Sequence, residues 1–167
     1  PVLALVPEAL RAWHAGAGAW AGAGDVNSRS IGIELANPGP LDGFPPFPEP
    51  QMAALDALLA GIRGRWPIAP TGIIAHSDMA PGRKTDPGPK LDWRRLARAG
   101  LAVWPRAADP DGGWDAFRAA AAAFGYGAPG GDWQATLAAF RLRFRPWASG
   151  PLAPEDVAAA RGLLPAG

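Results

Sequence analysis

Residues 73–89 read IIAHSDMAPGRKTDPGP and place one imidazole and two carboxylates close together in the chain. The β-branched pair Ile73 and Ile74 predicts a short buried strand that ends at His76. Asp86 follows ten residues later, in a loop that its prolines make stiff. A strand end holds a side chain firmly, so we expect His76 to face a cleft together with Asp86.

This pair of side chains suits a metal ion. Neutral imidazole and carboxylate are both zinc ligands, and catalytic zinc sites use three protein ligands and leave one position for water. Lys84 is then a candidate for stabilising negative charge on a substrate oxygen. His14 is the only other histidine, so the residues alone make it the obvious third ligand. The alternative is a surface loop with a solvated aspartate and an ordinary histidine.

Three segments in the first hundred residues carry a family resemblance. They are HSDMAPGRKTDPGP (76–89), RAWHAG (11–16) and SIGIEL (30–35). In this order they resemble the motifs of zinc-dependent N-acetylmuramoyl-L-alanine amidases of the AmpD/AmiD type, the type-2 amidases. The resemblance implies an α/β fold with a mixed β-sheet flanked by helices and one catalytic Zn²⁺. It also implies hydrolysis of the amide between the muramyl lactyl group and L-alanine, in peptidoglycan or in muropeptides.

Glu34 is the candidate general base. The alternation in 30–35 puts Ile31 and Ile33 on one face of a strand and Glu34 on the other, where a carboxylate can face a metal-bound water. The resemblance places the family's catalytic glutamate at this position. From the residues alone, the simpler interpretation of Glu34 is a half-exposed strand residue.

The resemblance also assigns roles around the cleft. It implies that His14 lies near the site without being one of the three zinc ligands, and that Arg11 lies near the bound muropeptide. The alternatives are that His14 is a hydrogen-bonded structural histidine and that Arg11 is a surface arginine. Our candidate substrate-binding residues are Arg11, Trp13, His14, Asn37 and Arg83. Trp20, in the Gly- and Ala-rich loop 16–28, either stacks on a sugar or packs on the core.

The N-terminal residues suggest an incomplete catalytic domain. The chain begins at Pro1 and continues directly into the apolar run VLALV (2–6), which resembles an interior strand. Members of the family carry an earlier strand whose histidine is a zinc ligand, and no counterpart is found here. The alternative to an active amidase is therefore a module that binds peptidoglycan without cutting it, or an inactive fragment.

Helical patterns account for most of the remaining chain. Apolar residues at helical spacing predict a helix over 51–66, and Asp92 resembles the N-cap of a helix over 93–99. Three further helices are predicted at 114–124, after Asp132, and from Pro154 onwards. We divide the chain into an amidase domain (1–100), a linker (101–113) and a small three-helix domain (114–167).

The last segment resembles a peptidoglycan-binding domain in its pattern LAAFRLRFR (137–145). A generic helical appendage is the alternative, in which Arg141, Arg143 and Arg145 form a solvated face. Such a domain favours a place of action in the cell envelope, periplasmic or outer-membrane associated, over a cytoplasmic recycling role.

Composition excludes several other classes. A net charge of +1 lacks the basic surface that nucleic-acid binding requires, and the absence of cysteine excludes disulfides and thiolate metal sites. No apolar run is long enough to span a membrane. The hydrophobic fraction of 49% is sufficient for a core, and we expect a monomer.

Overall fold

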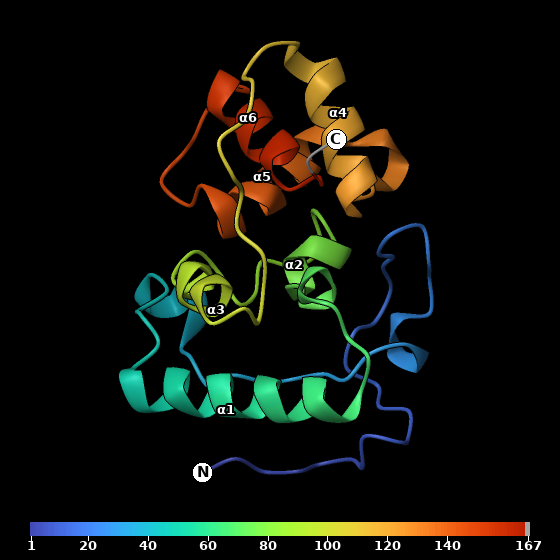
Figure 1. Cartoon of the computed structure of the whole chain (residues 1–167), viewed down its shortest axis with the longest axis vertical. Coiled ribbons are helices and arrows are strands. Elements are labelled where there is room, and N and C mark those ends of the chain that lie inside the picture. The colour runs from blue at the N-terminus through green and yellow to red at the C-terminus, as the bar shows by residue number, and fades with distance from the viewer. Residues whose placement is uncertain (166–167) are drawn as a thin grey trace.

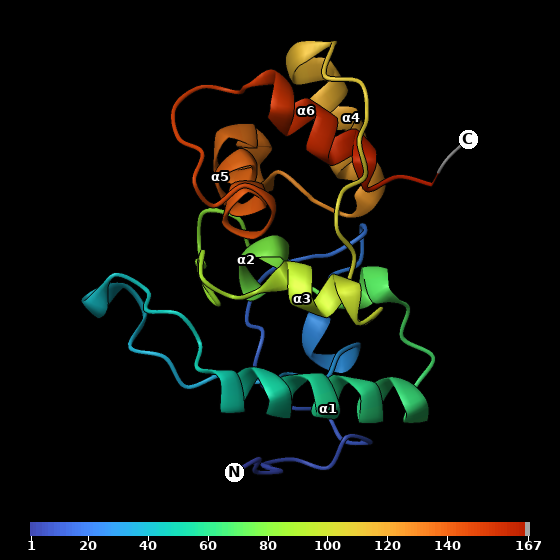
Figure 2. The ribbon, with the colours of Figure 1, turned by 60° about the vertical axis from the view of Figure 1, so that its left-hand side comes forward.

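The computed structural model describes residues 1–165, and its regular structure is helical. The α-helices are α1 (Glu49–Arg65), α2 (His76–Met79), α3 (Trp93–Arg98), α4 (Gly113–Phe124), α5 (Trp133–Phe144) and α6 (Pro154–Gly162). Short 3-10 helices lie at Val26–Ser28, Gly39–Asp42, Pro70–Gly72 and Pro129–Gly131. Helix α1 lies at one end of the molecule, α4–α6 gather at the other, and α2 and α3 lie between them (Figures 1 and 2).

The prediction of a mixed β-sheet is wrong for the part of the chain that the structure describes. Residues 1–165 contain no strand, and only an isolated antiparallel bridge joins Trp20 to Ala23. Ile73 has extended backbone angles (φ −86°, ψ 106°), as has Ala75 (φ −85°, ψ 158°). Extended residues become a strand only when a neighbour supplies ladder hydrogen bonds. Here 31–35 and 73–75 line a shared cavity instead of pairing.

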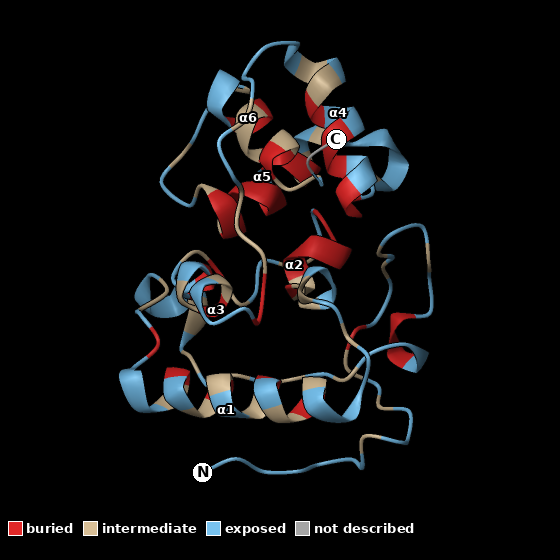
Figure 3. Cartoon of the chain, viewed as in Figure 1, coloured by how far each residue is buried: buried red, intermediate tan, exposed pale blue. Residues whose placement is uncertain are grey.

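The apolar run at the N-terminus is also not an interior strand. Val2, Leu3, Leu5 and Val6 are all exposed, with Leu5 at 80% of its possible surface. Residues 1–6 have no regular structure. Figure 3 shows this segment in the colour of exposed residues.

Helix α1 buries its apolar face in a first hydrophobic core, as the helical spacing of its apolar residues predicts. Its buried side chains are Met52, Leu55, Leu59 and Ile62. Three of them pack with residues of the α3 region, including Trp93 and Leu96. Asp92 caps α3 by accepting a hydrogen bond from the Arg95 N–H at 2.9 Å, which confirms the predicted N-cap. This core supports the loop that carries the candidate site.

The three C-terminal helices form a second core rich in aromatic residues, and their predicted positions are confirmed. Phe117, Phe140 and Phe144 are almost fully buried, and the rings of Phe117 and Phe140 meet edge to face at 5.3 Å. Asp132 caps α5 by accepting from the Ala135 N–H at 3.0 Å.

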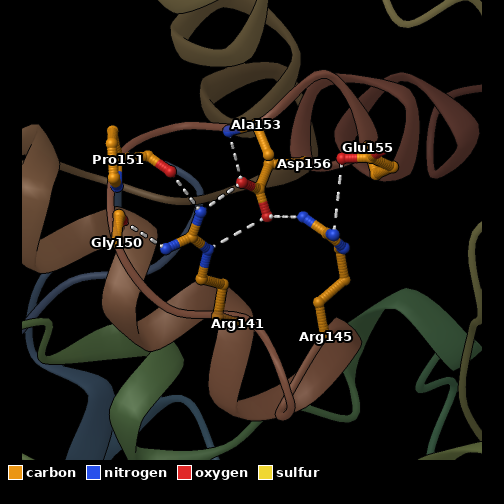
Figure 4. A network of polar contacts seen from close by, with 7 residues as sticks. All are labelled: Arg141, Arg145, Gly150, Pro151, Ala153, Glu155 and Asp156. Atoms are coloured by element: carbon orange, nitrogen blue, oxygen red, sulfur yellow. Dashed lines mark hydrogen bonds and ion pairs between the residues drawn. The ribbon is translucent and has the colours of Figure 1, made fainter.

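An ion-pair network ties α5 to α6 (Figure 4). Arg141 donates to the buried Asp156 carboxylate from Nε at 3.1 Å and from Nη2 at 2.5 Å, and Arg145 donates from Nη1 at 2.5 Å. Arg141 also reaches the carbonyls of 150–151. Burial acts to raise the pKa of Asp156, but hydrogen bonds from Arg141, the Ala153 N–H and Arg145 hold this pKa below its usual value. Arg141 and Arg143 are buried, and Arg145, just after the end of α5, is half-buried, so these arginines do not form a solvated face.

Candidate active site

His76 and Asp86 lie side by side. The His76 Nδ1 and Asp86 Oδ2 atoms are 3.0 Å apart, with the histidine side chain 18% exposed and the aspartate 56% exposed. A backbone hydrogen bond from the Ser77 N–H to the Asp86 carbonyl, 3.0 Å long, closes the loop between them. Asp86 is therefore held through both its backbone carbonyl and its side-chain carboxylate.

The second ring nitrogen of His76 is also in contact with an oxygen. Nε2 lies 2.7 Å from the Ala15 carbonyl, which also accepts a hydrogen bond from Arg83 Nη2 at 2.8 Å. A neutral imidazole has one N–H, so it can donate to only one of its two oxygen neighbours. The other nitrogen then turns its lone pair toward an oxygen, which is unfavourable. A cation bound between that nitrogen and that oxygen would stabilise the arrangement.

A cavity of about 450 Å³ gathers four of the predicted site residues. His14, Glu34, His76 and Asp86 all line it, and most of the other lining residues are apolar. This volume is typical of small-molecule sites, which combine apolar walls with a few polar groups. Glu34 is exposed, so its carboxylate is accessible from the solvent.

His14 is held beside segment 30–35. Its Nε2 atom is 3.4 Å from the Ser30 hydroxyl, and the backbone N–H groups of His14 and Ala15 donate to Asn27 Oδ1 at 2.9 and 2.8 Å. Any side chain at position 32 would meet the His14 ring, because a Cβ atom there would lie 2.5 Å from Cγ. Gly32 therefore permits the close approach of the two segments.

The other predicted residues lie outside the cavity lining. Arg11 pairs with Asp25 at 2.9 Å and lies over the Trp13 ring at 4.0 Å. Asn37 donates to the Pro45 carbonyl and accepts from the Gly39 N–H, within its own loop. Three more belong to this group: Arg83, whose guanidinium binds the Ala15 carbonyl, half-buried Lys84, and exposed Trp13.

The donor set fits zinc in part. His76 and Asp86 are zinc-binding side chains, and zinc bonds of about 2 Å reach two atoms 3.0 Å apart. Within residues 1–165, however, no three side chains of histidine, cysteine, aspartate or glutamate come close enough together to hold a metal ion. The described residues therefore supply two candidate zinc ligands, one fewer than a catalytic zinc site needs.

Sequence patterns did not point to three buried residues next to this site. Asp78, two residues after His76, binds Arg143 of α5 and Tyr126. Burial raises the pKa of Tyr126 well above its usual value, and the adjacent carboxylate acts in the same direction. Of these three residues, only Asp78 has a local sequence signal. It is an aspartate at the third position of a short helix, where capping carboxylates are common.

None of the helices within residues 1–165 combines the length and the apolar character needed to cross a bilayer.

Comparison with curated proteins finds amidases among the relatives of this chain. Curated relatives include N-acetylmuramoyl-L-alanine amidase AmiD of Escherichia coli, 47% identical over 108 residues, which are 62% of this chain and 39% of the relative. Another is 1,6-anhydro-N-acetylmuramyl-L-alanine amidase AmpD of Enterobacter cloacae, 43% identical over 57% of this chain and 49% of the relative. The matches thus span between about two fifths and half of these curated relatives.

Solved structures resemble almost the whole chain. The structure of AmpDh3 from Pseudomonas aeruginosa superposes with a TM-score of 0.89 at 35% identity, over 96% of this chain and 71% of that one. AmiD of E. coli, solved with anhydro-N-acetylmuramic acid-L-Ala-D-γ-Glu-L-Lys, gives a TM-score of 0.84 at 37% identity over 95% and 70%. The family model of the N-acetylmuramoyl-L-alanine amidases (Amidase_2) matches residues 1–89, and the chain belongs to this family.

Proposed function

We propose that the protein is a zinc-dependent N-acetylmuramoyl-L-alanine amidase that hydrolyses the amide bond between the N-acetylmuramoyl lactyl group and L-alanine. The observation that carries the proposal is the His76–Asp86 pair, 3.0 Å apart, on a cavity that Glu34 also lines. Family membership and two solved relatives in complex with anhydromuramyl peptides support the substrate class.

His76 and Asp86 would hold the ion. Zinc, when bound, lowers the pKa of water and polarises a carbonyl group. Glu34 would accept a proton from the attacking water on its carboxylate and pass it to the leaving amine. Lys84, two residues before Asp86 on the same loop, would stabilise negative charge on the substrate's carbonyl oxygen.

Other residues around the cavity are assigned to binding the substrate. The five residues that we assign to muropeptide binding are Arg11, Trp13, His14, Asn37 and Arg83. His14 lines the cavity, and the Trp13 side chain is 81% exposed, so both are accessible to a ligand.

The C-terminal helices are assigned to binding the polymer. We assign residues 1–100 to the amidase domain, 101–113 to a linker and 114–167 to a peptidoglycan-binding unit, so that the enzyme acts on its polymer in the cell envelope. Trp147, 71% exposed beside α5, is suited to stacking on a sugar ring. Recycling of small muropeptides in the cytoplasm is the alternative place of action.

The test is an assay of muropeptide hydrolysis with added zinc, following the release of the stem peptide by mass spectrometry. We expect Glu34→Gln to keep the fold, because the side chain is exposed, and to lower the rate by roughly 100-fold or more. Asp115→Asn, at a carboxylate 99% exposed on α4, serves as the matched control and should keep the wild-type rate.

Near wild-type hydrolysis by Glu34→Gln would contradict the proposed mechanism. If the wild-type chain binds muropeptide but releases no peptide in the presence of zinc, the protein is the alternative, a module that binds peptidoglycan without cutting it.

A further inference from the structure

Asp78 fixes the segment that carries His76. Its carboxylate accepts the Ala75 N–H at 2.8 Å, and so closes the first turn of α2 around His76. The side chain has no exposed surface. A buried carboxylate is stable only when hydrogen-bond donors and positive charge surround it. The partners of Asp78 therefore decide whether α2 keeps its place.

Those partners come from the C-terminal part of the chain. Arg143 of α5 donates from Nη1 to Asp78 Oδ2 at 2.7 Å, and the Tyr126 hydroxyl donates to Oδ1 at 2.5 Å. Both side chains are almost completely buried. The link made by these three residues joins α2 to a region about 50 to 65 residues later in the sequence.

Arg143 has few alternatives to Asp78. Its guanidinium carbon lies 4.0 Å above the Trp93 ring, and the Nε and Nη2 atoms have no hydrogen-bond acceptor within the described residues. Within those residues, the only carboxylate that reaches Arg143 at ion-pair distance is that of Asp78. The buried positive charge is therefore directed at a single carboxylate, that of Asp78, two residues after His76 on α2.

The loop 19–21 makes further contacts between α2 and the segment that follows α4. The Ala21 N–H donates to the Gly125 carbonyl at 2.9 Å, and the Trp20 ring packs edge to face on Tyr126 at 5.1 Å. The Ala19 N–H donates to the Met79 carbonyl, so this loop also holds α2. Trp20 thus packs on the core in the structure.

We propose that Asp78, Arg143 and Tyr126 are positioning residues for the metal site, through which the C-terminal helices set the orientation of His76. The inference rests on the proposed function, because it assigns the helical bundle to the scaffold of the amidase site in addition to any role in polymer binding. On this proposal zinc binding requires the helical bundle, although no residue of α4, α5 or α6 lines the cavity.

The test is a double-mutant cycle on the full chain with Asp78→Asn, Arg143→Met and the double variant. Its readouts are the zinc dissociation constant and the ring ¹⁵N resonances of His76, which are simple to assign because the chain has two histidines. We expect each single variant to weaken zinc binding at least tenfold and to shift or broaden the His76 resonances. The double variant should lose little more than either single variant.

Arg141→Met is the matched control. Arg141 is another buried arginine of α5 with a carboxylate partner, but that partner is Asp156 of α6. We expect this variant to lower the thermal midpoint while the His76 resonances and the zinc affinity stay within twofold of wild type. Equal loss of zinc affinity in Arg141→Met and Arg143→Met would overturn the proposal, since general destabilisation would then explain both.

Tyr126→Phe keeps the inference testable if Arg143→Met does not fold. It removes one hydrogen bond to Asp78 and leaves the ion pair intact. We expect a shift of the His76 resonances and faster hydrogen exchange at the Ala75 amide; wild-type values at both would also overturn the proposal. These two readouts need no metal, so they remain decisive if the wild-type chain binds no zinc and the proposed function itself fails.

Discussion

Arg141 and Arg143 lie two residues apart in α5, Arg145 follows as the C-cap residue, and an α-helix turns by about 100° per residue. The side chains of Arg141 and Arg143 therefore point in nearly opposite directions. Arg141 and Arg145 both bind Asp156 of α6, whereas Arg143 reaches Asp78 of α2 on the other side. One short run of arginines thus makes two separate buried ion-pair systems.

Glu8 gives a pH prediction at the same scale. Hydrogen bonds from the Arg65 guanidinium and the Trp66 indole lower the pKa of Glu8 from 4.5 to about 2. A lowered pKa means that the ionised carboxylate stabilises the fold fully above pH 4.5, and that this contribution is lost as the pH falls toward 2. We expect Glu8→Gln to lower the urea midpoint at pH 6 and to lower it less at pH 3.

The control for Glu8 is Asp42→Asn, because the Asp42 side chain is exposed and forms no ion pair within the described part of the chain. Its urea midpoint should differ from wild type by the same small amount at both pH values. A Glu8→Gln deficit that is equal at pH 6 and pH 3 would show that the carboxylate charge contributes nothing.

At the scale of elements, the sequence allowed every α-helix except α2 to be predicted, and the prediction of a sheet was wrong. Helices α1 and α5 carry local signals, an apolar stripe in one and an aspartate N-cap in the other, and such signals depend on residues close in the chain. A strand depends on a partner, so the β-branched residues of 31–35 and 73–75 could not establish a sheet alone. The arginine partners Asp78 and Asp156 lie too far away in the sequence for any local pattern to identify.

The loop 15–20 is the element that closes the site beside α2. Ala15 places its carbonyl at His76, and Gly18 lies so close to Met79 that a Cβ atom would come within 2.4 Å of the Met79 carbonyl oxygen. We expect Gly18→Ala to displace this loop, to destabilise the protein by about 1–3 kcal/mol as overpacking does, and to shift the His76 ring resonances.

Gly24→Ala is the control for this prediction, since nothing lies within 4 Å of a Cβ atom at position 24. It should leave both the unfolding free energy and the His76 resonances nearly unchanged. Wild-type stability in Gly18→Ala would mean that the loop and α2 are not packed as closely as the structure has them.

At the scale of the whole molecule, two cores are joined by the segment that follows α3. The α1–α3 core and the aromatic core of α4–α6 share Trp104, and Arg106 donates its N–H to the Gly162 carbonyl at 3.0 Å. The predicted linker 101–113 is therefore packed at its start: Leu101 and Ala102 are buried in the α1–α3 core, and Trp104 packs against both cores.

The proposed polymer-binding role of the helical unit gives a prediction at this scale. We expect Trp147→Ala to reduce co-sedimentation with peptidoglycan sacculi several-fold and to leave hydrolysis of soluble muropeptide unchanged, because an exposed indole stacks on sugars and lies in the helical unit. Leu41→Ala removes a side chain that is 91% exposed, and serves as the control. Undiminished co-sedimentation of Trp147→Ala would remove this tryptophan from the binding surface.

Zinc titration of the ¹⁵N-labelled chain, followed at the ring resonances of both histidines, tests the central claim most directly. The account predicts a saturable change at His76 that Asp86→Asn abolishes, because zinc is bound between these two side chains. A response that persists in Asp86→Asn, or that appears at His14 alone, would contradict the assignment of His76 and Asp86 as the zinc ligands.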